Sequence, residues 1–248
     1  MRPFEGIIFD LGNTLIYFEG SWLEVRSQAA EALYSSLKAS GLDLQRKEFI
    51  DYFLASLNDY HQEREIQLLE LTTFCMLQQV LINLGYPDVS DEFVRSALEE
   101  MYAVTQAHWI PEEDALPTLK LLNKSGYRLA MISNAGDDAD VQFLIDKAGL
   151  RSYFEIILTS AEQGIRKPDT RLFHAVLDYW GYTPAQVAMV GDTLNADILG
   201  ALDAGIFSIW ITGRADTPAN RDNIDTIQPA ASIPTLSELP ALLSSLGE

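Results

Sequence analysis

Four short segments of the sequence carry the side chains that are best suited to chemistry. They are Phe9–Thr14, Ile132–Asn134, Gly164–Asp169 and Val190–Asp197. Together they supply the carboxylates of Asp10, Asp192 and Asp197, the hydroxyl of Ser133 and the ammonium group of Lys167. Each segment ends or follows a run that we predict to be a β-strand, so the fold would gather all four at one edge of a sheet. That edge, at the carboxyl ends of the strands, is where α/β proteins bind their ligands.

Each of these segments, taken alone, also has a purely structural explanation. Asp10 and Asp192 belong to a residue type that is common in turns and helix caps, and Ser133 is a common connector between a strand and a helix. Lys167 could be a solvated surface charge, and Asp197 could support the terminus of its own helix. The four segments nevertheless occur in order, each beside a predicted strand end, and this arrangement favours a functional site.

The elements that would position these residues are short apolar runs rich in Ile, Val and Phe. The runs are Gly6–Phe9, Arg128–Ile132, Glu155–Leu158, Val187–Val190 and Ile206–Ile211. Such runs are typical of parallel strands that are buried on both faces. Apolar stripes at helical spacing lie between the later runs, from Leu116 to Leu122 and from Leu172 to Trp180. The alternation predicts an α/β fold with a Rossmann-like parallel sheet covered on both faces.

The alternation is interrupted after the first predicted strand. Between Glu19 and Gln106 the pattern favours helices, at about 21–39, 45–62, 65–84 and 90–106. We therefore expect two domains: a Rossmann-like core of residues 1–17 and 107–248, and an inserted all-helical cap of residues 18–106. Trp109–Pro111 would mark the return to the core. The Pro-rich stretch from Thr217 to Pro234 is predicted to be a loop that leads to a last helix at about 235–246.

The composition is that of a globular protein with a strongly acidic surface. Of the 248 residues, 48% are hydrophobic and 21% are charged. The net charge of −19, from 36 acidic and 17 basic residues, would repel nucleic acid and anionic membranes, so we expect neither as a partner. It would also repel a phosphorylated substrate. A phosphate site would therefore need local positive charge from a cation or from a lysine.

The sequence also suggests a cellular compartment. No apolar run approaches the roughly 18 residues that a membrane-spanning helix needs, and the apolar start, Gly6 to Phe18, does not have the pattern of a signal peptide. The single cysteine, Cys75, excludes an internal disulfide, and we expect it to be a small buried hydrophobe. These features predict a cytoplasmic protein.

The order of the four segments closely resembles that of the haloacid dehalogenase-like hydrolase superfamily, in the branch whose helical cap follows the first motif. The resemblance extends over nearly the whole chain. It is densest from Glu155 to Trp210, where Gly164–Asp169 and Val190–Asp197 look like the third and fourth motifs of that family. It is weakest in the cap, which varies most in the family and largely sets the choice of substrate.

The resemblance implies a phosphatase that uses a covalent intermediate and Mg²⁺. Asp10 would be the nucleophile, attacking phosphorus to form an aspartyl-phosphate that water then hydrolyses. Mg²⁺ would be bound by Asp10, Asp192 and the backbone carbonyl of Gly12, because this ion prefers hard oxygen ligands. Asp197 would orient the metal side of the site from outside the ligand set. Because a phosphate monoester is a dianion, an anionic nucleophile needs such a cation.

The resemblance also assigns groups that would bind the phosphate of a small-molecule substrate. Ser133 and the backbone amide of Asn134 would donate hydrogen bonds to the phosphoryl oxygens. Lys167 would lie as a point charge between Asp10 and the phosphate.

The sequence departs from the family pattern at Gly12, where most phosphatases of the family carry a second aspartate. That aspartate binds the metal through its carbonyl, protonates the leaving group and activates water. Glycine keeps the carbonyl and lacks the acid, and general acid–base catalysis is typically worth ~10²–10⁴ in rate. We therefore expect aryl, acyl or anomeric phosphates to be preferred over simple alkyl phosphates. The substrate or a cap residue could supply the proton instead, and the candidates in the cap are Glu19, Glu24, His61 and Glu65.

Three other functions compete with this interpretation. A 2-haloacid dehalogenase would use no metal, would typically have tyrosine in place of Gly12 and would lack the Gly-Asp-x-x-x-x-Asp pattern, which is present here at Gly191, Asp192 and Asp197. A catalytically impaired binding or regulatory protein is supported by Gly12, although it would have no need to keep both Lys167 and Asp192. A phosphotransferase would pass the phosphoryl group to a bound acceptor other than water.

Overall fold

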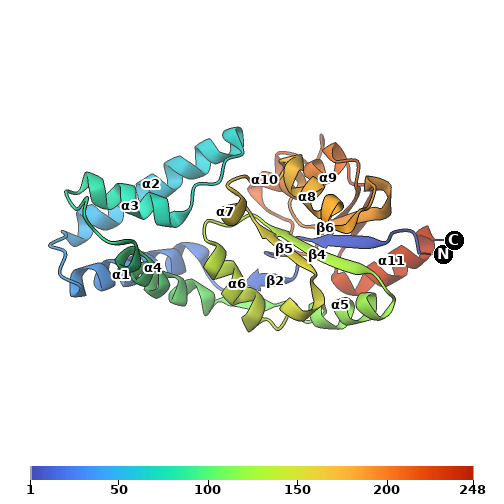
Figure 1. Ribbon diagram of the computed structural model, residues 1–248, viewed down its shortest axis with the longest axis horizontal. Helices are drawn as coiled ribbons and strands as arrows, with labels where there is room; N and C mark the ends of the chain where they lie inside the picture. The colour runs from blue at the N-terminus through green and yellow to red at the C-terminus, as the bar shows by residue number, and fades with distance from the viewer. Residues whose placement is uncertain (1, 248) are drawn as a thin grey trace.

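A six-stranded parallel sheet organises the larger part of the chain (Figure 1). The computed structural model describes residues 2–247, apart from the side chains of residues 64–66. The strand order is β5-β4-β1-β6-β7-β8, and every pairing is parallel. The strands are β1 (Gly6–Phe9), β4 (Arg128–Ser133), β5 (Ile156–Thr159), β6 (Val187–Gly191), β7 (Phe207–Ile211) and β8 (Ala231–Ile233). The predicted α/β class and parallel sheet are thus confirmed.

Helices cover both faces of the sheet (Figure 1). On one face lie α5 (Ala115–Lys124), α6 (Asp138–Lys147) and α11 (Leu239–Leu246), and on the other lie α8 (Thr170–Trp180) and α9 (Leu199–Asp203). Shorter turns complete this part of the chain: η1 (Arg151–Tyr153), α7 (Ser160–Gln163), η2 (Pro184–Gln186), η3 (Leu194–Ile198), α10 (Pro218–Arg221) and η4 (Leu236–Glu238).

Two apolar clusters hold these layers together, one on each face of the sheet. In β1, Ile7 and Phe9 pack with α5, α6 and α11, whereas Ile8 packs with α8 and α9. All three side chains are fully buried. Because successive residues of a strand point to opposite faces, a strand covered on both sides must be apolar throughout. This is why the predicted strands are continuous apolar runs.

Residues 22–106 form a helical bundle with an apolar core of its own (Figure 1). Its helices are α1 (Trp22–Ala39), α2 (Arg46–Gln67), α3 (Thr73–Asn83) and α4 (Asp91–Gln106). The predicted positions of α1 and α4 are right to within a residue. The prediction placed the start of the third helix too early, at about 65. The helix begins at residue 73 because Thr72 is its N-cap: the side chain of Thr72 accepts a hydrogen bond from the amide of Cys75.

Two short strands join the bundle to the sheet. In an antiparallel pair, β2 (Ile16–Phe18) lies beside β3 (Trp109–Pro111). The sequence located the return of the chain at residues 109–111 but did not predict the pairing. Three-residue strands have too few positions for a periodic pattern, and the partners are separated by the whole bundle.

The C-terminal region contains more regular structure than the sequence indicated. The predicted loop from 217 to 234 contains α10 and β8, and β8 adds a sixth strand beside β7. Cys75 is exposed on α3, contrary to the prediction that it is buried. None of the helices in the described part of the chain is long and apolar enough to cross a membrane.

Candidate active site

The strand order brings the predicted site residues together. Asp10 follows β1, Ser133 ends β4 and Asp192 follows β6, and β1 lies between β4 and β6 in the sheet. The chain runs from β1 towards β5 on one side and then returns to β6 on the other, so the strand order reverses at β1. Ligands of open α/β sheets bind at such a reversal, outside the carboxyl ends of the strands. Asp10, Ser133 and Asp192 are all buried there.

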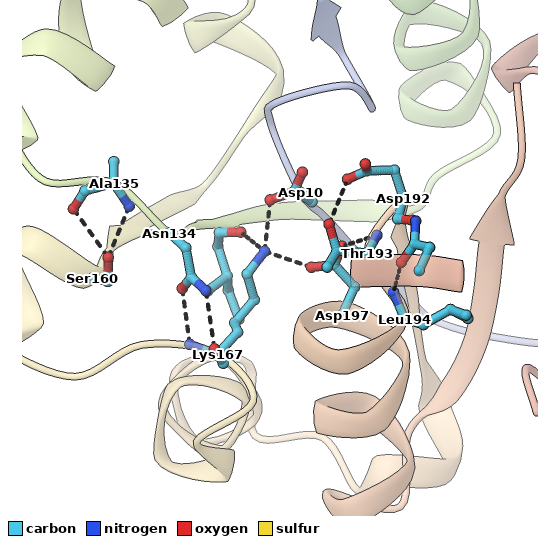
Figure 2. Close-up of polar contacts among 11 residues, drawn as sticks. Asp10, Asn134, Ala135, Ser160, Lys167, Asp192, Thr193, Leu194 and Asp197 are labelled. Atoms are coloured by element: carbon cyan, nitrogen blue, oxygen red, sulfur yellow. Dashed lines mark hydrogen bonds and ion pairs between the residues drawn. The ribbon is translucent and has the colours of Figure 1, made fainter. Parts of the chain in front are cut away.

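Lys167 lies at the centre of this group (Figure 2). Its Nζ is 2.6 Å from Oδ1 of Asp10, 2.6 Å from Oδ1 of Asp197 and 2.7 Å from the carbonyl oxygen of Ile132. The side chain is only 1% exposed, so these three acceptors replace water around the ammonium group. Burial opposes the charged form, but the carboxylates of Asp10 and Asp197 outweigh it and hold the pKa of Lys167 above its ordinary value.

The loop that carries Lys167 is fixed by the side chain of Asn134 (Figure 2). Its Oδ1 accepts a hydrogen bond from the backbone amide of Lys167 at 2.8 Å, and its Nδ2 donates to the carbonyl of Lys167 at 3.0 Å. This pair of hydrogen bonds ties the lysine loop to the end of β4, next to Ser133. The sequence indicated a role for the amide of Asn134 but gave no sign of this side-chain role.

Three carboxylates form a cluster that could hold a cation. One oxygen each from Asp10, Asp192 and Asp197 lies within 4.8 Å of the others. Burial raises the pKa of Asp192 well above its ordinary value, and the charges of Asp10 and Asp197 raise it further. When all three are ionised, they exceed the single ammonium group of Lys167 by two negative charges. A divalent cation with a preference for hard oxygen ligands, such as Mg²⁺, therefore fits this donor set.

Asp197 reaches the cluster because residue 191 is a glycine. A Cβ at Gly191 would lie 2.4 Å from the carboxylate of Asp197, which is much shorter than a van der Waals contact. Both oxygens of Asp197 accept hydrogen bonds, Oδ1 from Lys167 and Oδ2 from the amide of Thr193 at 2.9 Å. Burial raises the pKa of Asp197 to about 6, against the opposing effect of Lys167. These bonds suit a residue that supports the cluster from behind.

The backbone at Asp192 is anchored by two side chains that the sequence did not single out. Trp210 Nε1 and Asn220 Nδ2 donate hydrogen bonds to the carbonyl of Asp192, at 2.8 and 2.9 Å. Asn220 also accepts one from the amide of Leu194 at 2.8 Å and is itself buried. Asn220 lies in the stretch predicted to be a loop, where a lone asparagine gives no functional signal.

Gly12 faces the ring of Trp109. A Cβ at position 12 would lie 3.6 Å from Cη2 of Trp109, which is an ordinary van der Waals distance. Residue 12 could therefore carry a Cβ without a clash, and the indole ring of Trp109 would be the nearest neighbour of that atom. Trp109 belongs to β3, so the connection to the bundle forms one wall of the site.

A cavity of about 720 Å³ lies over the site and extends between the sheet and the helical bundle. Its floor includes Asp10, Ser133, Lys167, Asp192 and Asp197, and its remaining lining is largely apolar. The bundle contributes, among others, Trp22, Arg26, Phe53, His61, Met76 and Met101. Of the proposed proton donors, His61 lines the cavity, whereas Glu19 and Glu24 are not among its described lining residues. The side chain of Glu65 lies outside the described residues.

Several known phosphatases are similar in sequence to this chain. It is 29% identical over 223 residues to the glyceraldehyde 3-phosphate phosphatase of Methanothermobacter thermautotrophicus, covering 89% of this chain and 91% of that protein. It is 33% identical to the N-acylneuraminate-9-phosphatase of Rattus norvegicus over 61% of each chain. It is 33% identical to pyrimidine 5'-nucleotidase YjjG of Escherichia coli over 50% of this chain and 54% of that protein. The last two matches thus span little more than half of those proteins.

Two solved structures share the fold along almost the entire chain. A 2-haloacid dehalogenase from Pseudomonas syringae superposes with a TM-score of 0.68 at 24% identity, covering 98% of this chain and 99% of the other. A phosphatase from Thermococcus onnurineus superposes with a TM-score of 0.66 at 22% identity, covering 96% and 97%. The fold alone therefore does not separate the two activities.

The sequence profile of the haloacid dehalogenase-like hydrolases matches residues 4–205, which include all four site segments. The strand order, the clustered side chains and this match agree with the resemblance seen in the sequence. The chain belongs to the haloacid dehalogenase-like hydrolase family.

Proposed function

We propose that the protein is a Mg²⁺-dependent phosphatase that hydrolyses a small-molecule phosphate monoester through an aspartyl-phosphate on Asp10. The observation that carries this proposal is the position of Lys167, whose buried ammonium group lies 2.6 Å from Asp10 beside the cluster of three carboxylates. A nucleophile, a fixed positive charge and a set of oxygen ligands thus lie within one small region. The relatives named as phosphatases of small phosphorylated molecules support the same reaction class.

Asp10 and Asp192, with the carbonyl of Gly12, would hold Mg²⁺, and Asp197 would support them from behind. The ion supplies positive charge that offsets the phosphate dianion as an anionic nucleophile approaches it. The three ionised carboxylates exceed the single positive charge of Lys167 by two negative charges, and this excess supports the assignment.

The reaction would proceed in two steps at phosphorus. In the first, an oxygen of Asp10 forms a bond to phosphorus while the bond to the leaving oxygen breaks, and the leaving group departs with its electron pair. In the second, water attacks the same phosphorus, which releases inorganic phosphate and restores the carboxylate of Asp10. Lys167, Ser133 and the amide of Asn134 would bind the phosphoryl oxygens in both steps.

The proposed substrate is an ester with a good leaving group. Gly12 provides no acid to protonate a departing alkoxide, and the atoms of Trp109 that lie nearest to it are ring carbons. The leaving groups of aryl, acyl and anomeric phosphates depart as more stable anions than an alkoxide, so their cleavage depends less on that proton. The largely apolar lining of the cavity, which includes Trp22 and Phe53, is compatible with an organic group of considerable size.

The helical bundle would act as a cap over this site. The proposed division is a core of residues 1–17 and 107–248 and a cap of residues 18–106, which meet at the paired connectors β2 and β3. The cavity between the bundle and the sheet edge supports this role, because a closed cap would exclude water from the reaction.

Hydrolysis of p-nitrophenyl phosphate tests the proposal. The native protein and an Asp10→Asn variant, purified identically, would be assayed with and without Mg²⁺. We expect activity in the native protein only with Mg²⁺, and none in the folded variant. Equal rates in the two proteins, or no activity in the native protein with either aryl or acyl phosphates, would contradict the proposal and favour a binding protein.

A further inference from the structure

A second buried ionic cluster joins the helical bundle to the core. It is centred on Glu70, in the segment between α2 and α3, whose side chain has no exposed surface. Its Oε2 accepts hydrogen bonds from the hydroxyl of Ser160 at 2.8 Å and from Nη1 of Arg166 at 3.3 Å. Its Oε1 accepts one from the hydroxyl of Tyr60 at 2.7 Å. The carboxylate thus belongs to the bundle, while Ser160 and Arg166 belong to the core.

The backbone around Glu70 is bound to the core as well. The amide of Glu70 donates to the carbonyl of Gly164 at 3.0 Å, and the amide of Arg166 donates to the carbonyl of Leu68 at 3.1 Å. Leu69 and Ile165 form an antiparallel bridge between these two bonds. Leu68 has a φ of 55°, which is unfavourable for a leucine. A backbone strained in this way persists only where surrounding contacts hold it, often near functional sites.

These contacts reach the groups that would bind phosphate. Arg166 immediately precedes Lys167 in the chain. Ser160 Oγ, which donates to Glu70, accepts a hydrogen bond from the amide of Ala135 at 2.8 Å. Ala135 follows Asn134, whose side chain fixes the lysine loop, and Figure 2 shows the two pairs of contacts side by side along the end of β4. Glu70 therefore contacts the lysine loop directly, through Arg166, and is connected to the Ser133–Asn134 turn through Ser160 and Ala135.

The start of α3 lies against the same turn. The amide of Thr73 donates to the carbonyl of Gly136 at 2.8 Å. A Cβ at Gly136 would lie 2.7 Å from Oγ1 of Thr73, so the helix leaves no room for a side chain at that position. Segment 68–73 of the bundle thus makes close contact with both loops of the core.

Burial of a carboxylate is unfavourable unless charged and polar partners replace its water. Glu70 finds two of those partners, Ser160 and Arg166, only when segment 68–73 lies against the core. Docking of the segment and the arrangement of the two loops should therefore stabilise each other. Removal of the carboxylate would leave Arg166 without this buried acceptor, and it would leave the hydroxyl of Ser160 with the carbonyl of Ala135, at 3.1 Å, as its acceptor.

We propose that Glu70 is a positioning residue, which sets Lys167 and the Ser133–Asn134 turn in place when segment 68–73 of the bundle is docked on the core. Glu70 itself would not touch the substrate. The kinetic consequence rests on the proposed phosphatase function, because a poorly placed lysine or turn would slow phosphoryl transfer. The structural consequence, ordering of the two loops by Glu70, does not depend on turnover.

Two substitutions, Glu70→Ala and Glu70→Gln, test the proposal. Glu162→Gln is the matched control, because Glu162 is exposed and lies in α7, two residues after Ser160. The kcat and KM for p-nitrophenyl phosphate would be measured per folded protein. Amide hydrogen exchange would be measured in peptides covering residues 133–137 and 164–168. We expect Glu70→Ala to lower kcat about 10–100-fold, because a misplacement of catalytic groups by about 1 Å can cost ~10²-fold in rate, with little change in KM.

Glu70→Gln keeps the shape and one acceptor, so it should restore part of the kcat, and Glu162→Gln should match the native protein. Exchange in both peptides should be faster in Glu70→Ala. A kcat within twofold of native would overturn the proposal, and so would a lower kcat without faster exchange in either peptide. If the native protein hydrolyses no phosphate ester, the proposed function fails, while the exchange measurement still decides whether Glu70 orders the two loops.

Discussion

The Nζ of Lys167 lies 2.6 Å from Oδ1 of Asp197, and each of these side chains is only 1% exposed. Asp197 is therefore as close to the lysine as Asp10 is. The two carboxylates bind the ammonium group together, and the carbonyl of Ile132 provides a third acceptor. Such an arrangement leaves the lysine little freedom to move. The positive charge of Lys167 offsets the negative charges of both Asp10 and Asp197.

Replacement of this lysine should destabilise the fold in a pH-dependent way. In a Lys167→Met variant, the carboxylates of Asp10 and Asp197 would remain buried without their cation. Breaking a buried ion pair by removal of one partner costs about 3–5 kcal/mol, and we expect a loss of this size in urea unfolding at pH 7.5. The loss should be smaller at pH 5, because burial raises the pKa of Asp197 to about 6 and this carboxylate can then bind a proton. Lys120→Met, at an exposed position, is the control, and an equally small effect in both variants would refute the expectation.

Mg²⁺ should stabilise the native protein against unfolding through the carboxylate cluster. Binding to the folded state alone contributes about 2.7 kcal/mol when the ion is at 100 times its dissociation constant. We expect Asp192→Asn to lose most of this stabilisation and Asp203→Asn, at an exposed position, to keep it. Thermal unfolding with and without Mg²⁺ measures the effect. The same response in Asp192→Asn as in the native protein would show that the ion binds elsewhere.

An acid restored at position 12 should broaden the range of substrates. The first side-chain atom of Gly12→Asp would meet Trp109 at an ordinary contact distance, and the backbone there needs no positive φ. The variant should hydrolyse alkyl phosphates at least 10-fold faster than the native protein, since general acid–base catalysis is worth ~10²–10⁴ in rate. The gain for p-nitrophenyl phosphate should be smaller. Gly12→Asn, which has the same shape without the acid, is the control, and an equal gain in that variant would contradict the explanation.

Asp140 should make the stability of the protein depend on pH. Burial raises its pKa from 3.8 to about 6, against the hydrogen bond from Gln106. Because the folded-state pKa is raised, the contribution of Asp140 to stability is fully present below pH 4 and is lost as the pH rises through 6. Asp140→Asn should therefore be more stable than the native protein by about 1–3 kcal/mol at pH 7.5, with no difference at pH 4.

Urea unfolding across this range measures the difference between the two proteins. Asp203→Asn serves as an exposed control that should follow the native curve at every pH. A difference between Asp140→Asn and the native protein that stays constant from pH 4 to pH 7.5 would argue against a titration of Asp140.

The sequence was sufficient to predict the sheet and the grouping of the main site residues. Continuous apolar runs identified five of the six strands, since strands covered on both faces must be apolar. The reversal of strand order could not be read from those runs. The position of Asp10, Ser133 and Asp192 at strand ends was nevertheless enough to predict that they lie together, because parallel strands present their carboxyl ends at one edge.

Contacts between distant parts of the chain were not predictable in the same way. Glu70 is one acidic residue among many, and nothing in its neighbours in sequence shows that it pairs with Arg166. Asn220 is likewise a polar residue in a polar stretch, and only the fold brings it to the carbonyl of Asp192. The strands β2 and β3 are too short for a period and pair across the whole bundle. In each case the signal is a long-range contact, which local pattern does not contain.

The central claim, that Asp10 carries a covalent phosphoryl group, can be tested by trapping the intermediate. The native protein would be quenched in acid during turnover of p-nitrophenyl phosphate with Mg²⁺, reduced with borohydride and analysed by peptide mass spectrometry. Reduction of an aspartyl-phosphate gives homoserine. We expect homoserine at position 10 in this sample, and none when substrate or Mg²⁺ is omitted. Sustained turnover with Asp10 unmodified, or homoserine at a different aspartate, would contradict the claim.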